Sequence, residues 1–308
     1  MDLPDHESLR RIVRSFAHLR AAHGEGIGRP PMVQPTGAFF PDEFRGDAAS
    51  VARLLKKMID LAPLSPEIGV ELAFAVPDEE RAGGCGSLAC GSGSGSAAGL
   101  SVEELADHYR VVVSTNDVAN ADVLATSLAR SIGALVLLET DEPVSPASSE
   151  LAAVACGFGV LLLNGAAVWA KSCGGLRMAQ ATSLAAEEIA VALALFAAVH
   201  EYRPSEARRH LGATQRAAFE VAQDWVDSNP WLIESLRDAP HRLVTGEIDL
   251  EPVRGIFGQW WHRRKLDQAL RAPSSRPPSL VSEARRRRIE EIEALLDEDP
   301  GTAPIGEG

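Results

Sequence analysis

A long helical pattern runs through residues 121–139, ADVLATSLARSIGALVLLE. Apolar residues recur in it at helical spacing and few residues break it, so the pattern predicts one continuous helix. A single charge, Arg130, interrupts its apolar middle. Because an unpaired charge in apolar surroundings is costly, two arrangements are open. Arg130 either meets the carboxylate of Glu150, at the start of the next predicted helix, or lies on a solvated face.

The segment that follows, Leu151–Ala170 (LAAVACGFGVLLLNGAAVWA), carries no charge and is long enough to cross a bilayer. It is rich in Ala and Gly, Asn164 interrupts it, and no basic cluster flanks it closely. A helix that is apolar all round also occurs in the core of a large domain. We therefore expect a buried core helix, with membrane association through 151–170 as an alternative.

The remaining elements are predicted from periodicity, caps and breakers. Asp47 can cap a helix, and Pro204 separates two others. The stretch 83–99, GGCGSLACGSGSGSAAG, lacks periodicity and predicts a flexible loop. The predicted helices are Glu7–His23, Ala48–Leu61, Leu184–Tyr202, Ser205–Val226 and Glu283–Leu296, and the predicted strands are Ile68–Val76 and Tyr109–Ser114.

This order of elements predicts an α+β fold, a small sheet followed by a predominantly helical body. We expect three regions: an N-terminal helix and loop over 1–34, the main domain over 35–240, and a peripheral C-terminal arm over 241–308 with a charged helix and tail. The arm includes the Pro/Ser-rich linker 273–279.

The composition limits the function classes. The chain has 308 residues, with 43 acidic and 30 basic side chains and a formal net charge of −13. Nucleic-acid binders depend on Lys and Arg to neutralise phosphates, so we expect no nucleic-acid partner. Four cysteines are too few for a disulfide-built secreted scaffold. With no secretory signal in the first 20 residues, we expect a cytoplasmic protein.

Several residues could carry chemistry on spacing alone. His18 and His23 are one residue off the i, i+4 spacing of a helical zinc site, which favours a surface role. Cys85 and Cys90 form a C-x4-C pair, but free thiols are the simpler expectation for all four cysteines. His200 and Glu201, joined by Glu187 or Glu188, could form an acid/base site, although a histidine at a helix C-terminus also favours the helix dipole. An alternative function is therefore a hydrolase built on these non-zinc residues.

Five segments together resemble a family of largely uncharacterised bacterial zinc-metallopeptidase-like proteins of the HExxH (zincin-like) type. Their order and spacing are similar over residues 35–230. The family's central helix has the form VATIAHELGHVLLLG. The matching segments are PTGAFFPDEF (35–44), AAGL (97–100), ATSLARSIGALVLLE (125–139), SELAAVACGFGVLLLNGA (149–166) and IAVALALFAAV (189–199).

The resemblance also implies that the zinc motif is lost. Aligned without a gap, Arg130 and Ala134 stand where the family has its two histidines, and Ser131 stands where it has its catalytic glutamate. Glu150 takes the place of the family's aspartate, and Pro146 that of a third ligand. A zinc hydrolase needs three protein ligands to hold the ion and lower the pKa of its bound water.

We therefore expect a degenerate member of this family, a pseudoenzyme without metal or cofactor. Its vestigial site would consist of Arg130, Ser131, Ala134, Pro146 and Glu150. Its expected role is to bind or regulate a protein or peptide partner, because a fold can keep its shape after losing its chemistry.

Overall fold

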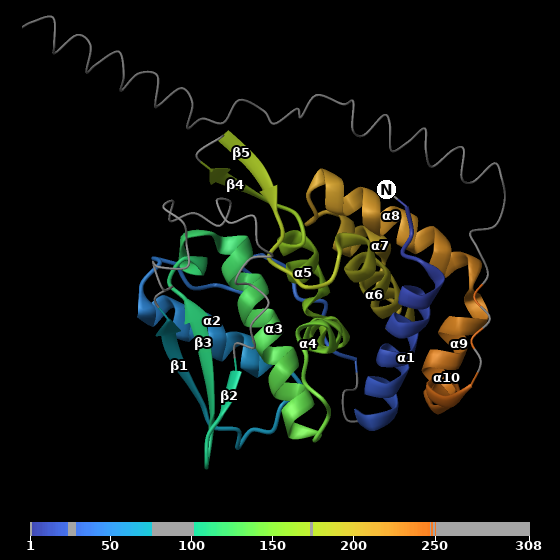
Figure 1. The fold of residues 1–308 in the computed structure, drawn as a ribbon, viewed down its shortest axis with the longest axis horizontal. Coiled ribbons are helices and arrows are strands. Elements are labelled where there is room, and N and C mark those ends of the chain that lie inside the picture. Colours follow the sequence, from blue (N-terminus) through green and yellow to red (C-terminus); the bar gives the residue numbers. More distant parts are fainter. Residues whose placement is uncertain are drawn as a thin grey trace, which may run out of the picture. The chain divides into compact units, whose positions relative to one another are not determined.

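The computed structural model describes residues 2–23, 29–75, 102–172, 175–246, 248 and 250, within the compact unit Met1–Leu266. It shows the predicted α+β fold, a small three-stranded sheet beside a predominantly helical body (Figure 1). Our predictions for 83–99, for Cys85, Cys90 and Cys173, and for the C-terminal arm beyond 250 lie outside the described residues.

The first elements are α1 (His6–His23), α2 (Ala48–Leu61), β1 (Val70–Ala75), β2 (Val102–Glu104), β3 (Tyr109–Ser114), η3 (Asp117–Ala119) and α3 (Ala121–Glu139). The later ones are α4 (Pro146–Ala153), η4 (Val154–Phe158), α5 (Gly159–Gly165), β4 (Val168–Ser172), β5 (Gly175–Ala179), α6 (Ala186–Val199), α7 (Pro204–Arg208), α8 (Ala213–Ser228), α9 (Pro230–Asp238) and α10 (Pro240–Thr245).

The sheet has the order β1-β3-β2, with β3 in the centre. Strands β1 and β3 are parallel, with Val70 opposite Tyr109, and β2 runs antiparallel to β3. Val111 and Val113 of β3 are fully buried, while their neighbours in the strand are half-exposed, as expected for alternating faces. From β3 the chain passes through η3 directly into α3, so the sheet positions the start of that helix.

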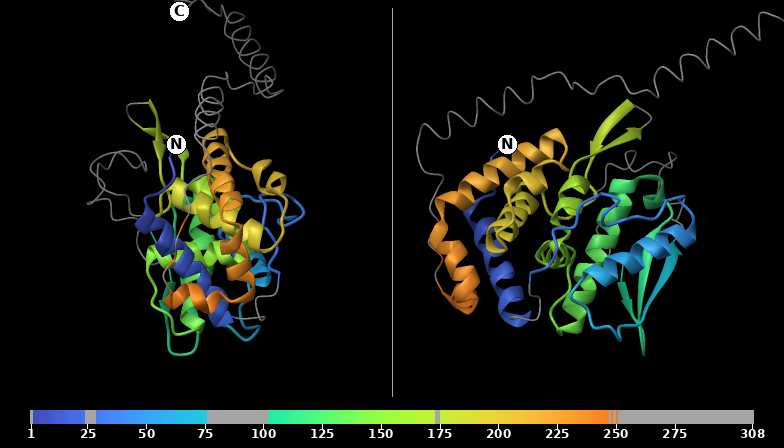
Figure 2. Two further views of the ribbon diagram at one scale, coloured as in Figure 1. Left: turned by 90° about the vertical axis from the view of Figure 1, so that its right-hand side faces the viewer. Right: turned by 180° about the vertical axis from the view of Figure 1, so that it is seen from behind.

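Helices α2 and α3 begin at capped residues. The side chain of Asp47 accepts a hydrogen bond from the backbone N–H of Ser50, and Ser50 Oγ accepts one from the Asp47 N–H. At α3, the side chain of Asn120 accepts bonds from two backbone N–H groups in the first turn. These side chains satisfy N–H groups that have no partner within the helix. Helix α2 lies next to both the sheet and α3, as the views from the front and from behind show (Figures 1 and 2).

The apolar segment after α3 is helical but not continuous. Helix α4 passes through the wide turn η4 into α5, and Gly157 at the break has φ +98°. The backbone N–H of Val33 donates to Gly157 O at 2.9 Å, and a Cβ at Gly157 would lie 2.0 Å from Pro31 O. Only glycine permits this close approach of the segment 29–36. The predicted helix over 151–170 was also wrong at its C-terminal end, because α5 ends at Gly165.

Two described helical stretches are long and apolar enough to cross a membrane, Ala121–Glu139 and Pro146–Gly165. In this fold 78% and 83% of their most apolar windows are buried by the rest of the protein. The expectation that 151–170 lies in the core is confirmed over 151–163, where every residue is buried. Both stretches serve here as core helices.

Helix α6 forms the centre of the helical body. Its residues Ile189–Ala197 are all buried, which agrees with its apolar residues on every side. It packs against α8, α5, α1 and α9. Ile12 and Phe16 of α1 are fully buried in the same core cluster. Helix α1 therefore shares one hydrophobic core with α6.

The structure corrects two further predictions and adds three strands. The helix expected over 184–202 is α6, shorter at both ends. The helix expected over 205–226 is two helices, α7 and α8, because Gly212 and the turn before it separate them. The two-stranded hairpin β4–β5, which projects from the body in Figure 1, and the short strand β2 were not predicted.

Candidate functional site

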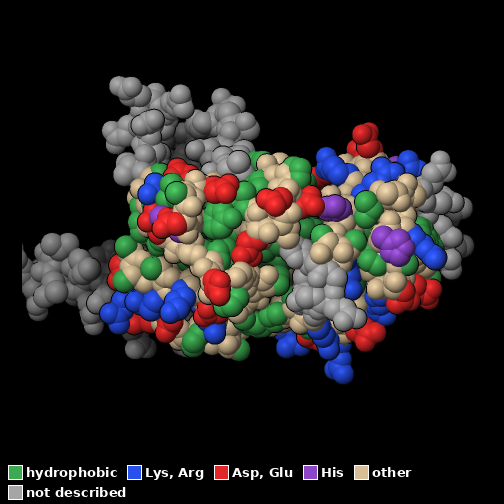
Figure 3. All heavy atoms as spheres, turned by 90° about the horizontal axis from the view of Figure 1, so that it is seen from below, with side chains coloured by type: hydrophobic (Ala, Val, Ile, Leu, Met, Phe, Trp, Pro, Cys, Tyr) green, Lys and Arg blue, Asp and Glu red, His purple; other side chains and the backbone are tan. Residues whose placement is uncertain are grey.

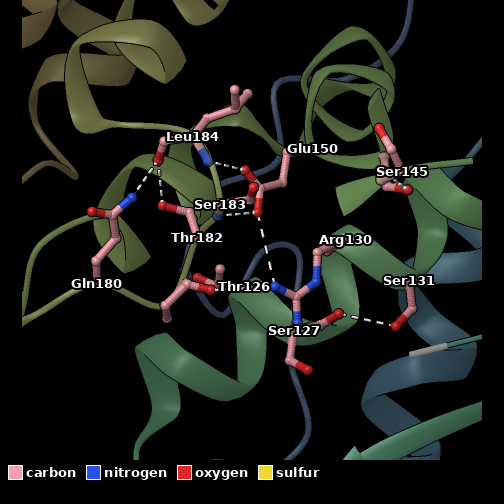
Figure 4. A network of polar contacts seen from close by, with 12 residues as sticks. Thr126, Ser127, Arg130, Ser131, Ser145, Glu150, Gln180, Thr182, Ser183 and Leu184 are labelled. Atoms are coloured by element: carbon pink, nitrogen blue, oxygen red, sulfur yellow. Dashed lines mark hydrogen bonds and ion pairs between the residues drawn. The ribbon is translucent and has the colours of Figure 1, made fainter. Parts of the chain in front are cut away.

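The predicted vestigial site contains a buried arginine, Arg130. The Arg130 side chain is 7% exposed, and its Nη1 lies 3.8 Å from Glu150 Oε1 (Figure 4). The same nitrogen donates to the backbone carbonyl of Ala181 at 3.4 Å, whereas the buried Nε has no hydrogen-bond partner among the described residues. The ion pair between Arg130 and Glu150 that the sequence suggested is therefore present, and the solvated alternative is not.

Glu150 connects α4 to the loop that leads into α6. Its carboxylate accepts hydrogen bonds from the backbone N–H groups of Ser183, at 2.6 Å, and Leu184, at 2.8 Å. The side chain is completely buried. Burial raises the pKa of Glu150 above its ordinary value, while these two N–H groups and Arg130 oppose the rise. The carboxylate is thus fully engaged by this chain's own donors.

A second carboxyl group, that of Asp117 in η3, completes the charge cluster. Burial raises the pKa of Asp117, against the opposing effects of a hydrogen bond from Ser127 and the charge of Arg130. Burial likewise lowers the pKa of Arg130, against the opposing charges of Glu150 and Asp117. Arginine nevertheless keeps its proton in proteins. One permanent cation therefore interacts electrostatically with two carboxyl groups that come from different elements.

The other residues of the predicted vestigial site make local contacts within the fold. Ser131 Oγ donates to the backbone carbonyl of Ser127 at 3.0 Å. Ala134 is buried one turn after Arg130 on the same face of α3. Pro146 is half-buried at the first position of α4, one turn before Glu150. Between the helices, a Cβ at Gly133 would lie 1.9 Å from Ser149 O, so glycine sets the close approach of α3 and α4.

These residues do not fit a zinc ion. Arg130 is a cation, and Ala134 and Pro146 have no side-chain lone pair to donate. The remaining carboxylate, that of Glu150, is already bonded to two N–H groups and paired with Arg130. Over the parts of the chain that the structure describes, no group of three or more His, Cys, Asp or Glu side chains could hold a metal ion. No hydrolytic step through a metal can be derived at this position.

The other candidate residues are partnered or buried. His18 Nε2 lies 2.7 Å from Glu142 Oε1, at the surface of α1. Cys156 is a buried free thiol, and its burial raises its pKa to about 12. A thiol with this pKa is not a nucleophile near neutral pH.

The residues of the alternative hydrolase do not converge. His200 is 8% exposed and packs against the ring of Phe196, and burial together with nearby arginines lowers its pKa to about 4. Glu201 is exposed and pairs with Arg237 at 3.1 Å. Glu187 and Glu188 lie in the first turn of α6, at the opposite end from His200. The acid/base cluster expected from the sequence is therefore not formed by these four residues.

A cavity of about 270 Å³, which the sequence did not predict, lies between α2, the segment 35–44, the start of α3 and the end of α5. Its lining comes from four separate stretches of chain, so no local motif could reveal it. Met58, Leu124 and Leu161 form a buried apolar floor. Such concave, mostly apolar sites are where proteins bind small molecules.

No protein-family model, curated protein or solved structure matches the chain. The resemblance to zincin-like metallopeptidases therefore remains a prediction from the residues.

Proposed function

We propose that this protein is a non-catalytic zinc-peptidase-like protein that binds or regulates a protein or peptide partner, in the cytoplasm. The observation that supports the proposal is the buried Arg130, held beside Glu150 at the position where the resemblance places a histidine ligand. A permanent positive charge here repels a dication and takes up the one carboxylate that could bind it. In this proposal α3 keeps the position of the family's central helix, and Arg130 forms an ion pair there in place of a zinc ligand.

The metal part of the proposal is tested by equilibrium dialysis of the purified full chain against zinc, followed by elemental analysis and a general peptidase assay. The proposal expects no stoichiometric zinc at the Arg130 position and no hydrolysis that a chelator abolishes. Zinc retained in equal proportion to protein, with chelator-sensitive hydrolysis, would contradict it.

A gain-of-site variant tests the alignment itself. In R130H/A134H two imidazoles stand one turn apart on one face of α3, at the positions where the resemblance places two zinc ligands. Glu150 loses its ion pair with Arg130 but keeps its hydrogen bonds from Ser183 and Leu184, so it offers a carboxylate oxygen that the family does not use as its third ligand. We expect this variant to retain zinc. The matched control, K56H/D60H, places two histidines at the same spacing on the exposed face of α2, at positions that do not line the cavity and are far from Glu150 in the sequence. Equal zinc affinity in both variants would count against a vestigial site at α3.

The partner is tested by photo-crosslinking in cells. Phe44, Phe74 and Met178 are the exposed large hydrophobic residues of the described chain. Phe74 lies on β1, at an edge of the sheet, where a partner could add contacts. With a photoreactive amino acid at Phe74, the proposal expects one discrete adduct that is absent when the probe stands at the exposed Asp60 on α2. No discrete adduct at Phe74 would oppose binding at this edge.

A further inference from the structure

The cavity introduced above is apolar at its floor and charged at its rim. The buried side chains of Met58, Leu124 and Leu161 lie at the bottom. Half-buried Phe40 and Leu54 form the walls. This arrangement suits a compact hydrocarbon body, because its burial removes apolar surface from water. The volume of about 270 Å³ lies just below the range for drug-sized ligands, so the fitting molecule is small.

Two cations stand at the rim. Arg53 and Lys57 lie one turn apart on α2, and both line the cavity. Neither forms an ion pair with a described residue. Lys57 is half-buried, as when a methylene stem packs on an apolar wall while the ammonium group reaches water. In Figure 3 Lys and Arg side chains gather at the edge of the molecule on the side where Figure 1 places α2.

Three acidic residues also line the cavity, and two of them are already stabilised. Glu43 accepts two hydrogen bonds from Arg45. Asp122 lies in the first turn of α3, where the helix dipole favours a negative charge. Asp42 is on the surface side, in an exposed segment. The side of the rim formed by α2 is therefore positive, with Arg53 and Lys57, while the acidic residues lie on the segment 35–44 and at the start of α3.

We propose that this cavity binds a small organic acid, with its apolar body on Met58, Leu124 and Leu161 and its carboxylate at Arg53 and Lys57. The cavity is separate from the Arg130 cluster, so the inference does not rest on the proposed function. A free acid is favoured over a macromolecule because the cavity is concave and of limited volume.

The test is isothermal titration of the full chain with octanoate, octan-1-ol and octylammonium, which share a chain length and differ in charge. Octanoate is expected to bind at one site, about fivefold more tightly than the alcohol, and octylammonium more weakly than the alcohol. Octylammonium binding as tightly as octanoate would overturn the proposal by assigning the rim to Asp42 and Asp122. No binding of octanoate would overturn it as well.

Variants locate the site. In R53Q/K57Q the affinity for octanoate should fall to that for the alcohol, while the alcohol binds unchanged. The matched control is Lys56→Gln, the exposed neighbouring lysine that does not line the cavity, which should leave octanoate binding intact. Ala125→Phe, at a half-buried lining position, should fill the cavity and abolish binding of all three probes. Unchanged octanoate affinity in a folded Ala125→Phe protein, verified by circular dichroism, would place the acid elsewhere and refute the proposal.

Discussion

The guanidinium of Arg130 lies 3.8 Å from the carboxylate of Glu150, and both side chains are buried. They belong to consecutive helices, α3 and α4, that approach closely at Gly133. The carboxylate is bonded to the loop before α6, and the guanidinium to the same loop at Ala181. One ion pair thus fixes two helices relative to a loop from a distant part of the chain.

Removing the cation of this pair should destabilise the protein strongly. In Arg130→Met, Glu150 keeps its buried charge without a counter-ion, which costs about 3–5 kcal/mol in free energy of unfolding. Urea denaturation measures the loss. The control is Arg45→Met, which removes an exposed ion pair with Glu43 and should cost less than about 1 kcal/mol. Equal stability of the two variants would show that the buried pair contributes nothing.

Gly157 should tolerate no side chain. Gly157→Ala combines an unfavourable positive φ with a contact of 2.0 Å to Pro31 O, and should cost about 3 kcal/mol or more. Gly46 is the matched control, because it also has a positive φ, +74°, but nothing lies within 4 Å of the position that a Cβ would occupy there. Gly46→Ala should therefore cost only about 1 kcal/mol. If thermal denaturation gave the same loss of stability for both variants, the close approach of the segment 29–36 to Gly157 would be refuted.

Local sequence signals predicted the elements that local physics controls. The bounds of α2, β3 and α3 match the prediction, because a cap such as Asp47 or a periodic apolar pattern lies within each element itself. The α+β class followed from the order of these elements. The Arg130–Glu150 pair was one of the two arrangements that the sequence suggested for a charge in an apolar helix, the other being a solvated face.

What the sequence could not show depends on distant contacts. The break at Gly157 exists because the segment around Pro31 and Val33 passes against it, and no local pattern contains that information. The N–H groups of Ser183 and Leu184 reach Glu150 only after folding. The hairpin β4–β5 did have a local signal, the glycine pair 174–175 between two short β-prone stretches, which the uncharged run 151–170 obscured.

Cys156 should be unreactive in the folded protein. Its thiol is buried and its pKa is raised to about 12, so almost no thiolate forms near neutral pH. In the variant C85S/C90S/C173S it is the sole cysteine. Ellman's reagent should then release no colour from the native protein and one equivalent after denaturation. A rapid reaction of Cys156 with the reagent in the native protein would place the thiol at the surface and contradict the structure.

His200 should make stability depend on pH below neutrality. Its pKa is about 4 in the folded protein, against an ordinary value of about 6.5. Between these values the unfolded chain binds a proton that the folded protein does not, so the free energy of unfolding falls as the pH is lowered. The loss begins below about pH 6.5, is complete below about pH 4, and amounts to at most about 3 kcal/mol.

The comparison with His200→Gln isolates this effect from the titration of Glu150, Asp117 and the other histidines. Glutamine stays neutral throughout, so the difference in unfolding free energy between the wild-type protein and the variant should shrink as the pH falls from about 7 to about 4. Urea denaturation across this range measures it. A difference that stays constant with pH would mean that the folded protein protonates His200 as readily as the unfolded chain, and that Arg20, 3.4 Å away, does not oppose the charge.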